Sequence, residues 1–144
     1  MICPDVNLLL YAVNKAFPQH REAKTWWDQT LSGTVPVSLL HVVVLGFVRL
    51  SMNHRVFPTP LDADQVVGVV DSWLGQPNVQ LLSPGESHWG VFKAMLQSGR
   101  ATGNLTTDAH IAAMASEFGL TVYSNDADFA RFPGISVANP LAAS

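Results

Sequence analysis

The sequence is poor in charged residues, in lysine and in cysteine. Only 13% of its 144 residues are charged, and the lysines are Lys15, Lys24 and Lys93. The net charge of −3 and the pI of about 5.9 are evidence against a protein that grips nucleic acid through a broad basic surface. They leave open an enzyme that engages a phosphate through a bound metal. The single cysteine, Cys3, cannot form an internal disulfide, and its apolar setting next to Pro4 favours a packing role in a reducing compartment.

Long apolar runs and a secretory leader are also lacking. The longest apolar stretch, residues 42–50, is interrupted by Gly46 and Arg49 and is too short to span a bilayer. The N-terminus has no basic segment followed by a long apolar run, so we expect no signal peptide, no membrane association and a cytoplasmic protein. The hydrophobic content of 48% is sufficient for one domain with a sizeable core.

Short apolar segments alternate with helical patterns along the chain. We expect strands at residues 2–5, 35–37, 79–82, 120–124 and 135–137, and helices at residues 7–14, 20–31, 39–52, 61–74, 86–97 and 108–118. Ser38 is expected to cap the helix at 39–52, whose apolar residues nearly surround it and predict burial on most sides. Gly119 is expected to end the helix at 108–118. The alternation predicts an α/β domain with a mostly parallel sheet of four to five strands flanked by helices.

Four aspartates are conspicuous in a sequence with so few charges. Asp5, Asp108, Asp126 and Asp128 lie at or near predicted strand ends or at a helix start. Sites in parallel α/β sheets lie beyond the carboxyl ends of the strands, so these carboxylates are expected to meet there. Carboxylates held together raise one another's pKa, and no lysine or arginine is adjacent to them in sequence. A divalent metal such as Mg²⁺ prefers carboxylate oxygens, so the pattern favours metal-assisted phosphodiester chemistry.

Each of these residues also has a purely structural interpretation. Asp5 could be a turn residue at a strand end, and Asp108 could stabilise a helix start through the helix dipole. Asp126 and Asp128 could be ordinary turn residues. Asn7 could cap the first helix or support the site. The metal interpretation of the acids therefore needs evidence beyond their positions.

That evidence comes from four segments that follow one another along the chain. They are PDVNLLLYA at residues 4–12, GFVRLSMNHRVF at 46–57, NLTTDAHIAA at 104–113, and SNDADF with FPG and NPL within 124–141. Together they resemble the PIN domain, and more narrowly the VapC toxin ribonucleases of bacterial toxin–antitoxin pairs. The resemblance covers the whole length and implies a single PIN domain over residues 1–144.

The resemblance implies a metal-dependent endoribonuclease that is the toxin of a VapBC pair. By position, Asp5, Asp108 and Asp126 match the catalytic acids, and together with Asp128 they match ligands of Mg²⁺ or Mn²⁺. A water activated by the metal would attack an RNA phosphodiester. The family also implies an RNA substrate, a VapB-type antitoxin as partner and a homodimer.

Two further polar residues match the family pattern, and one acid of that pattern is missing. Ser124 and Thr106 match polar positions that could support the metal ligands. The family commonly has a glutamate on the helix after the second strand, and that position falls on Gly46. Residues 29–61 contain no acid, which puts a complete two-metal site in question. Arg49, alone among apolar residues, is expected to be paired or to extend to water, with phosphate contact as the alternative.

Two other functions compete with the ribonuclease hypothesis. A degenerate PIN domain would bind RNA or a partner without cleaving, and Gly46 motivates this alternative. An α/β phosphatase or response-regulator-like domain would need a nucleophilic aspartate and usually a lysine near the phosphate. The lysines Lys15, Lys24 and Lys93 lie on predicted helices away from strand ends, which disfavours that class.

Overall fold

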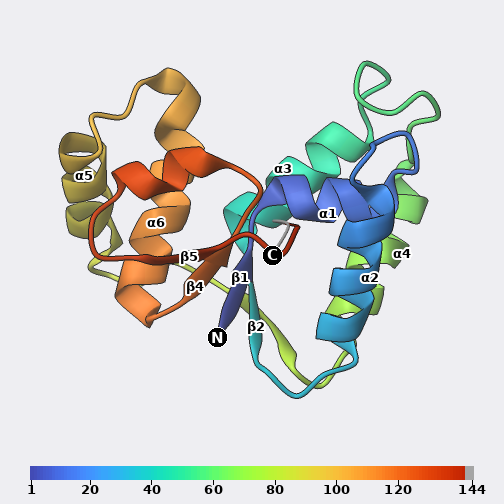
Figure 1. The fold of residues 1–144 in the computed structure, drawn as a ribbon, viewed down its shortest axis with the longest axis horizontal. Helices are drawn as coiled ribbons and strands as arrows, with labels where there is room; N and C mark the ends of the chain where they lie inside the picture. Colours follow the sequence, from blue (N-terminus) through green and yellow to red (C-terminus); the bar gives the residue numbers. More distant parts are fainter. Residues whose placement is uncertain (142–144) are drawn as a thin grey trace.

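The computed structural model describes residues 1–141, and a sheet of five parallel strands lies at its centre (Figure 1). The strands are β1 (Ile2–Pro4), β2 (Val37–Leu40), β3 (Val79–Leu82), β4 (Thr121–Tyr123) and β5 (Ser136–Ala138). Their order across the sheet is β3-β2-β1-β4-β5, so the first strand is central, and every neighbouring pair is parallel. The predicted α/β class with a mostly parallel sheet is confirmed.

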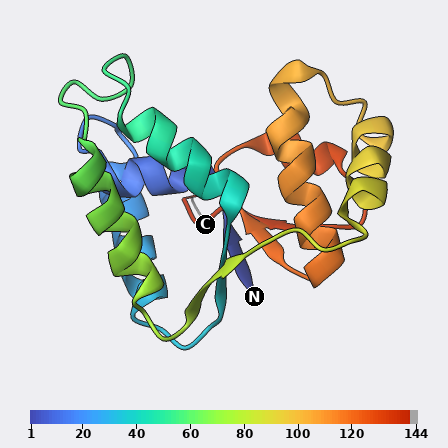
Figure 2. The same cartoon turned by 180° about the vertical axis from the view of Figure 1, so that it is seen from behind.

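Six α-helices connect these strands within the described residues. They are α1 (Val6–Val13), α2 (His20–Leu31), α3 (His41–Ser51), α4 (Ala63–Leu74), α5 (His88–Ser98) and α6 (Thr106–Phe118), with short 3-10 turns η1 (Gly103–Leu105) and η2 (Ala127–Arg131). Figure 1 shows α1 to α4 grouped together, with α5 and α6 beside β4 and β5, and Figure 2 shows the same division from behind. No helix in residues 1–141 is long and apolar enough to cross a membrane.

The junction between β2 and α3 differs from the sequence prediction. Ser38 does not cap a helix, because it lies fully buried inside β2 and α3 begins at His41. Residues 37–40 pair one by one with residues 79–82 of β3, and this backbone ladder extends the strand past the point where the sequence favours a helix. The end of α6 is as predicted, with Gly119 in the left-handed conformation at φ 65°.

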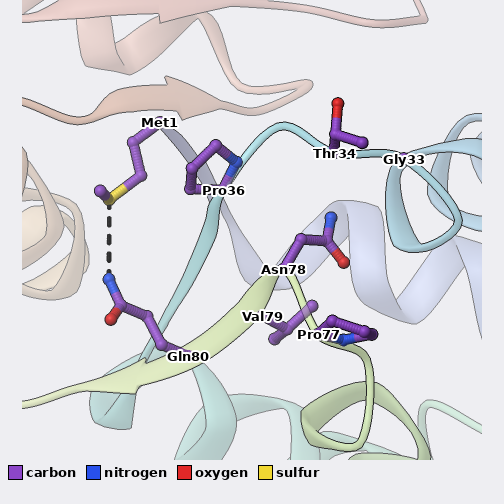
Figure 3. A pocket seen from close by; sticks show the side chains of 8 residues that line it. All are labelled: Met1, Gly33, Thr34, Pro36, Pro77, Asn78, Val79 and Gln80. Atoms are coloured by element: carbon purple, nitrogen blue, oxygen red, sulfur yellow. Dashed lines mark hydrogen bonds between the residues drawn. The ribbon is translucent and has the colours of Figure 1, made fainter.

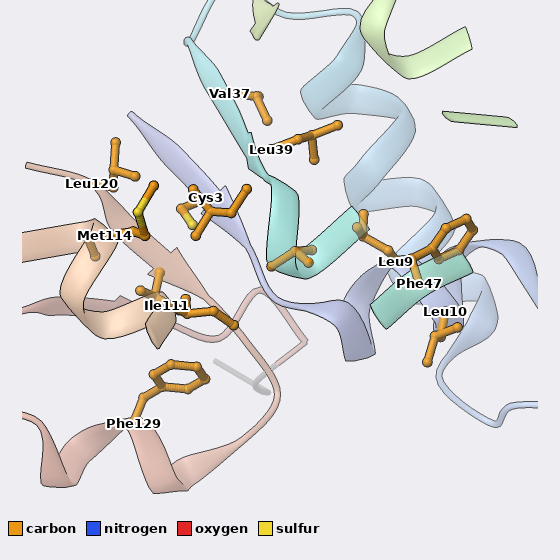
Figure 4. Packing of buried hydrophobic residues seen from close by; sticks show 14 of the residues in the cluster. Cys3, Leu9, Leu10, Val37, Leu39, Phe47, Ile111, Met114, Leu120 and Phe129 are labelled. Atoms are coloured by element: carbon orange, nitrogen blue, oxygen red, sulfur yellow. The ribbon is translucent and has the colours of Figure 1, made fainter. Parts of the chain in front are cut away.

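The hydrophobic core collects side chains from both groups of helices (Figure 4). Leu9 of α1 and Phe47 of α3 lie in one part of it, and Ile111 of α6 and Phe129 of η2 lie in another, all without exposed surface. Cys3 of β1 is fully buried between them, and this burial raises the pKa of its thiol to about 12. The packing role predicted for Cys3 is confirmed.

Helix α3 is buried or half-buried on most sides, as predicted, but one face is exposed. Val43 and Phe47 are buried in the core, whereas Leu45 is 62% exposed and Arg49 is also exposed. Positions four apart share a helix face, so Leu45 and Arg49 lie on the same side of α3. That side borders a pocket instead of the core.

Candidate functional site

The four aspartates predicted as site residues lie beside one another at the carboxyl-end edge of the sheet. Pro4 of β1 is opposite Tyr123 of β4 in parallel register, so the residues that follow these two strands are neighbours. Asp5 follows β1 directly, and its backbone N–H donates to the Tyr123 carbonyl at 2.9 Å. The other three acids lie in the first turn of α6 and in the η2 turn that follows β4.

Three of the acids form a close group. One carboxylate oxygen from each of Asp108, Asp126 and Asp128 lies within 4.8 Å of the others. Asp5 does not belong to this group, but it lines a pocket of about 320 Å³ together with Asp108 and Asp126. The structure therefore places three predicted ligands in contact range of a single ion and the fourth acid on the wall of the same pocket.

Asp5 is held rigidly by two hydrogen bonds. Its side chain is 7% exposed, Oδ1 accepts from the Val6 backbone N–H at 2.7 Å, and Oδ2 accepts from the Ser124 hydroxyl at 2.7 Å. Burial and the nearby charge of Asp126 raise the pKa of Asp5, while the two hydrogen bonds oppose this increase. The contact with Val6 also makes Asp5 the N-cap of α1, so its structural and functional interpretations are compatible.

Ser124 connects several of the polar side chains around the acids. Besides donating to Asp5, its hydroxyl accepts from the backbone N–H of Asp126 at 2.9 Å and from Nδ2 of Asn7 at 3.4 Å. Asn7 also accepts from the Asn125 backbone N–H at 3.4 Å, so it belongs to this network and does not cap α1. These contacts fix the start of α1 and the segment after β4 relative to each other.

Thr106, which the resemblance matches to a supporting polar position, has no hydrogen bond to the acids among the described residues. The Thr106 hydroxyl donates to the carbonyl of Thr102 at 3.4 Å, within its own turn. The next residue, Thr107, lines the pocket beside Asp108. The sequence could not separate the two threonines because the choice depends on where the first turn of α6 begins.

The pKa of Asp108 is raised by burial and by the neighbouring acids. Its pKa is raised to about 7, first by burial, then by the charges of Asp5 and Asp126, with further contributions from a hydrogen bond to Asp126 and the charge of Asp128. In the absence of a cation, Asp108 therefore retains a proton well above the pH at which an isolated aspartate loses it.

No basic side chain neutralises these carboxylates within residues 1–141. The contacts between acidic and basic groups there are Lys24–Asp28 and His88–Glu117, and neither includes one of the four acids. Arg49 lies on the pocket wall and forms no ion pair among the described residues. The donors are carboxylate oxygens, so the residues present fit a hard divalent cation such as Mg²⁺ or Mn²⁺.

Gly46, the position that the resemblance assigns to the family's glutamate, is also part of this pocket. Gly46 of α3 lines it, and a Cβ placed on Gly46 would lie 3.0 Å from a methyl carbon of Val6. The pocket therefore receives no carboxylate from α3, and a side chain at this position would require Val6 to move.

A larger hollow of about 640 Å³ lies at the opposite edge of the sheet (Figure 3). Met1, Pro36 and Asn78 directly precede β1, β2 and β3, and Gln80 lies within β3. Its lining contains no acidic or basic side chain. It therefore offers no carboxylate for a metal, and the acidic pocket is the better candidate site.

Comparison with known proteins decides the family. The PIN domain family model matches residues 2–135. Ribonuclease VapC33 of Mycobacterium tuberculosis (strain ATCC 25618 / H37Rv) is 40% identical over 141 residues, which are 98% of this chain and 99% of that protein. Ribonuclease VapC37 of the same strain is 38% identical over 138 residues, 96% of each chain. This chain belongs to the PIN-domain family and to its VapC ribonucleases.

Solved structures of VapC toxins and their complexes share the fold. VapC20 of Mycobacterium tuberculosis, described as a toxin that cleaves the sarcin–ricin loop, has a TM-score of 0.67 at 18% identity and covers 90% of this chain and 93% of its own. VapBC2 of Rickettsia felis, bound to a promoter DNA fragment, has a TM-score of 0.69 at 19% identity, covering 96% and 98%. The predicted PIN-like architecture is thereby confirmed.

Proposed function

We propose that this chain is a divalent-cation-dependent endoribonuclease and the toxin of a VapBC toxin–antitoxin pair. The observation that carries the proposal is the group of Asp108, Asp126 and Asp128 beside Asp5, in a chain of the VapC ribonuclease family. These carboxylates lack a basic partner in the described part of the chain, and their oxygens suit Mg²⁺ or Mn²⁺.

The acids have distinct tasks in this proposal. A bound cation would supply a water of lowered pKa and offset the charge that develops on the scissile phosphate. Asp5 is fixed by Val6 and Ser124, so its carboxylate keeps its orientation. Asp108 is hydrogen-bonded to Asp126, and the proton on Asp108 must leave before both carboxylates can act as ligands. Asp128 adds a further, exposed carboxylate to the group.

A second function, binding of RNA or a partner without cleavage, is favoured by Gly46. The pocket has no carboxylate from α3, so a cation there would be held by fewer protein ligands and more water. Binding without cleavage predicts that the purified chain retains RNA but leaves it intact at every cation concentration.

The proposal also includes three partners. They are an RNA substrate, a VapB-type antitoxin and a second copy of the chain in a homodimer. Solved structures with the same fold include a toxin–antitoxin complex from Klebsiella pneumoniae and the DNA-bound VapBC of Salmonella typhimurium. An acidic pocket without a basic partner suits an arginine or lysine supplied by an antitoxin.

An RNA cleavage assay with matched aspartate variants tests the proposed function. The purified chain is expected to cleave RNA with Mg²⁺ or Mn²⁺ and to stop in EDTA. Asp108→Asn should reduce the rate about a hundredfold or more, because it removes a charged oxygen from the site. Asp71→Asn is the control, since Asp71 is an exposed acid on α4. Undiminished cleavage by Asp108→Asn would refute the mechanism.

A further inference from the structure

The candidate pocket has two walls of different chemistry. One carries the carboxylates of Asp5, Asp108 and Asp126. The other is a single face of α3, formed by residues three or four positions apart: Val42, Leu45, Gly46, Arg49 and Leu50. Val6, Asn7 and Leu10 of α1 complete the lining. This α3 wall is apolar except for Arg49. None of its residues has a role in the proposed cleavage chemistry.

Arg49 is available to bind an anion. It is exposed and forms no ion pair within residues 1–141, although three aspartates line the same pocket. A guanidinium presents several N–H donors in a planar fork that matches phosphate oxygens. A phosphate held at the acids through a cation would thus lie in a pocket that also contains a positive side chain.

The apolar part of the α3 wall is open to solvent. Leu45 is 62% exposed, and Gly46 beside it has no side chain to fill the pocket. Exposed apolar surface gains stability when another apolar surface covers it. A nucleobase or ribose next to a bound phosphate has such a surface, and aliphatic side chains can pack on it.

We propose that this face of α3 is the subsite for the nucleotide next to the scissile phosphate. Arg49 binds the phosphate of that nucleotide, and Leu45 and Val42 pack against its base or ribose. The inference rests on the proposed ribonuclease function and adds to it the residues that seat the substrate. A nucleotide joins one phosphate to a flat base, and this face of α3 places one arginine next to apolar residues.

The test compares Arg49→Gln with Arg21→Gln. Arg21 is also exposed but lies on α2, outside the acidic pocket. With a short single-stranded RNA of mixed sequence and Mn²⁺, Arg49→Gln should raise KM about tenfold with a smaller change in kcat. The dependence of log(kcat/KM) on log salt should become shallower by about one, since one phosphate contact is lost. Arg21→Gln should change neither, and Arg49→Lys should recover part of the loss.

A second pair of variants tests the apolar contact. Leu45→Ala should also raise KM for the same RNA. Val67→Ala is the matched control: Val67 is similarly exposed, at 56%, but it lies on α4 and does not line the acidic pocket, so its loss should leave KM unchanged. Stabilisation by Mn²⁺ should be the same in Arg49→Gln as in wild type, which shows that the acidic group is intact. Loss of Mn²⁺ binding in this variant would mean that Arg49 acts on the cation site, and the subsite would be rejected.

The outcomes separate this inference from the proposed function. If wild type cleaves RNA and Arg49→Gln matches Arg21→Gln in KM and salt dependence, only the subsite is wrong. If wild type does not cleave, fluorescence anisotropy with the same RNA decides: weaker binding by Arg49→Gln supports the subsite, and equal binding rejects it. If Arg49→Gln changes only the affinity for the antitoxin, the face is a protein-binding surface and the proposal is wrong.

Discussion

Asp108 connects folding to pH at the scale of a single residue. Its pKa in the folded protein is about 7, compared with 3.8 for an unperturbed aspartate, chiefly because it is buried and then because of the charges of Asp5 and Asp126. Between these two pH values the folded state binds more protons than the unfolded state. The contribution of Asp108 to the free energy of unfolding is therefore greatest at low pH and is lost as pH rises through about 7.

We expect the melting temperature of the cation-free protein to show this loss. Asp108→Asn should remove the contribution. The melting temperature of wild type should therefore fall relative to that of the variant as pH increases from about 4 to about 7. Thermal melts in EDTA measure it. Comparing the two proteins is necessary because burial lowers the pKa of His110. That shift makes the stability of both proteins increase with pH, which is opposite to the effect of Asp108. A difference that is independent of pH would contradict the assignment.

The hydrogen bonds of Ser124 give a second prediction at the scale of a single residue. Its hydroxyl is the donor to Oδ2 of the nearly buried Asp5 and the acceptor for the Asp126 backbone. Ser124→Ala should cost about 1–3 kcal/mol of stability, since Asp5 loses a partner without gaining water. It should also weaken Mn²⁺ binding by about 10–100-fold if Asp5 contributes to the site.

Chemical denaturation and calorimetry measure these two effects. Ser116→Ala is the matched control, because Ser116 is exposed on α6. A Ser124→Ala protein with the stability and Mn²⁺ affinity of the control would show that the hydroxyl does not position Asp5.

At the scale of secondary-structure elements, most strands and helices are predictable and their junctions are not. Helix α2 and strand β3 have the predicted bounds, His20–Leu31 and Val79–Leu82. The boundary at Ser38 is wrong because strand β2 is buried on both faces, and its apolar run merges in sequence with that of α3. Which face of α3 is exposed depends on the pocket between α3 and the acids, which is formed by segments distant in sequence.

The glycine in α3 gives a prediction at the scale of the element. Gly46→Ala should have nearly wild-type stability, because the contact with Val6 costs about 1 kcal/mol and the helix propensity of alanine returns about as much. Gly46→Glu introduces the same Cβ and also a carboxylate on the pocket wall. It should therefore bind Mn²⁺ about tenfold more tightly than Gly46→Ala.

The comparison between these two variants removes the steric effect that they share. Calorimetric titration with Mn²⁺ gives the affinities. Equal affinity in Gly46→Glu and Gly46→Ala would mean that Gly46 is not the position of the missing acid.

At the scale of the whole molecule, the sequence predicts which four acids lie near one another. It does not predict that three of them form a close group and that Asp5 stands apart. The alternation of strands and helices predicts a parallel sheet with its site at the carboxyl ends of the strands. The pairing of β1 with β4, which brings Asp5 beside the acids after β4, is known only from the structure. The separation of Asp5 from the group of three depends on the hydrogen bonds of Ser124 and Val6, which are not readable from spacing. The same holds for Arg49, whose place on the pocket wall depends on the rotation of α3.

A single PIN domain over residues 1–144 is a further proposal at this scale. Both groups of helices contribute to one core, with Phe47 and Phe129 in the same cluster. We therefore expect one cooperative unfolding transition, with the calorimetric enthalpy equal to the van't Hoff enthalpy. Two separate transitions in the calorimetric scan would show that the two helix groups unfold independently.

The most direct test of the account is whether binding of the cation at the acids and cleavage of RNA are the same event. Single-turnover cleavage is measured as a function of Mn²⁺ concentration, and calorimetry gives the Mn²⁺ affinity of the same sample. The account predicts half-maximal cleavage at the concentration that half-saturates the protein, and loss of both signals in a variant combining Asp108→Asn and Asp126→Asn. Cleavage in EDTA, or Mn²⁺ binding that survives in the double variant, would contradict it.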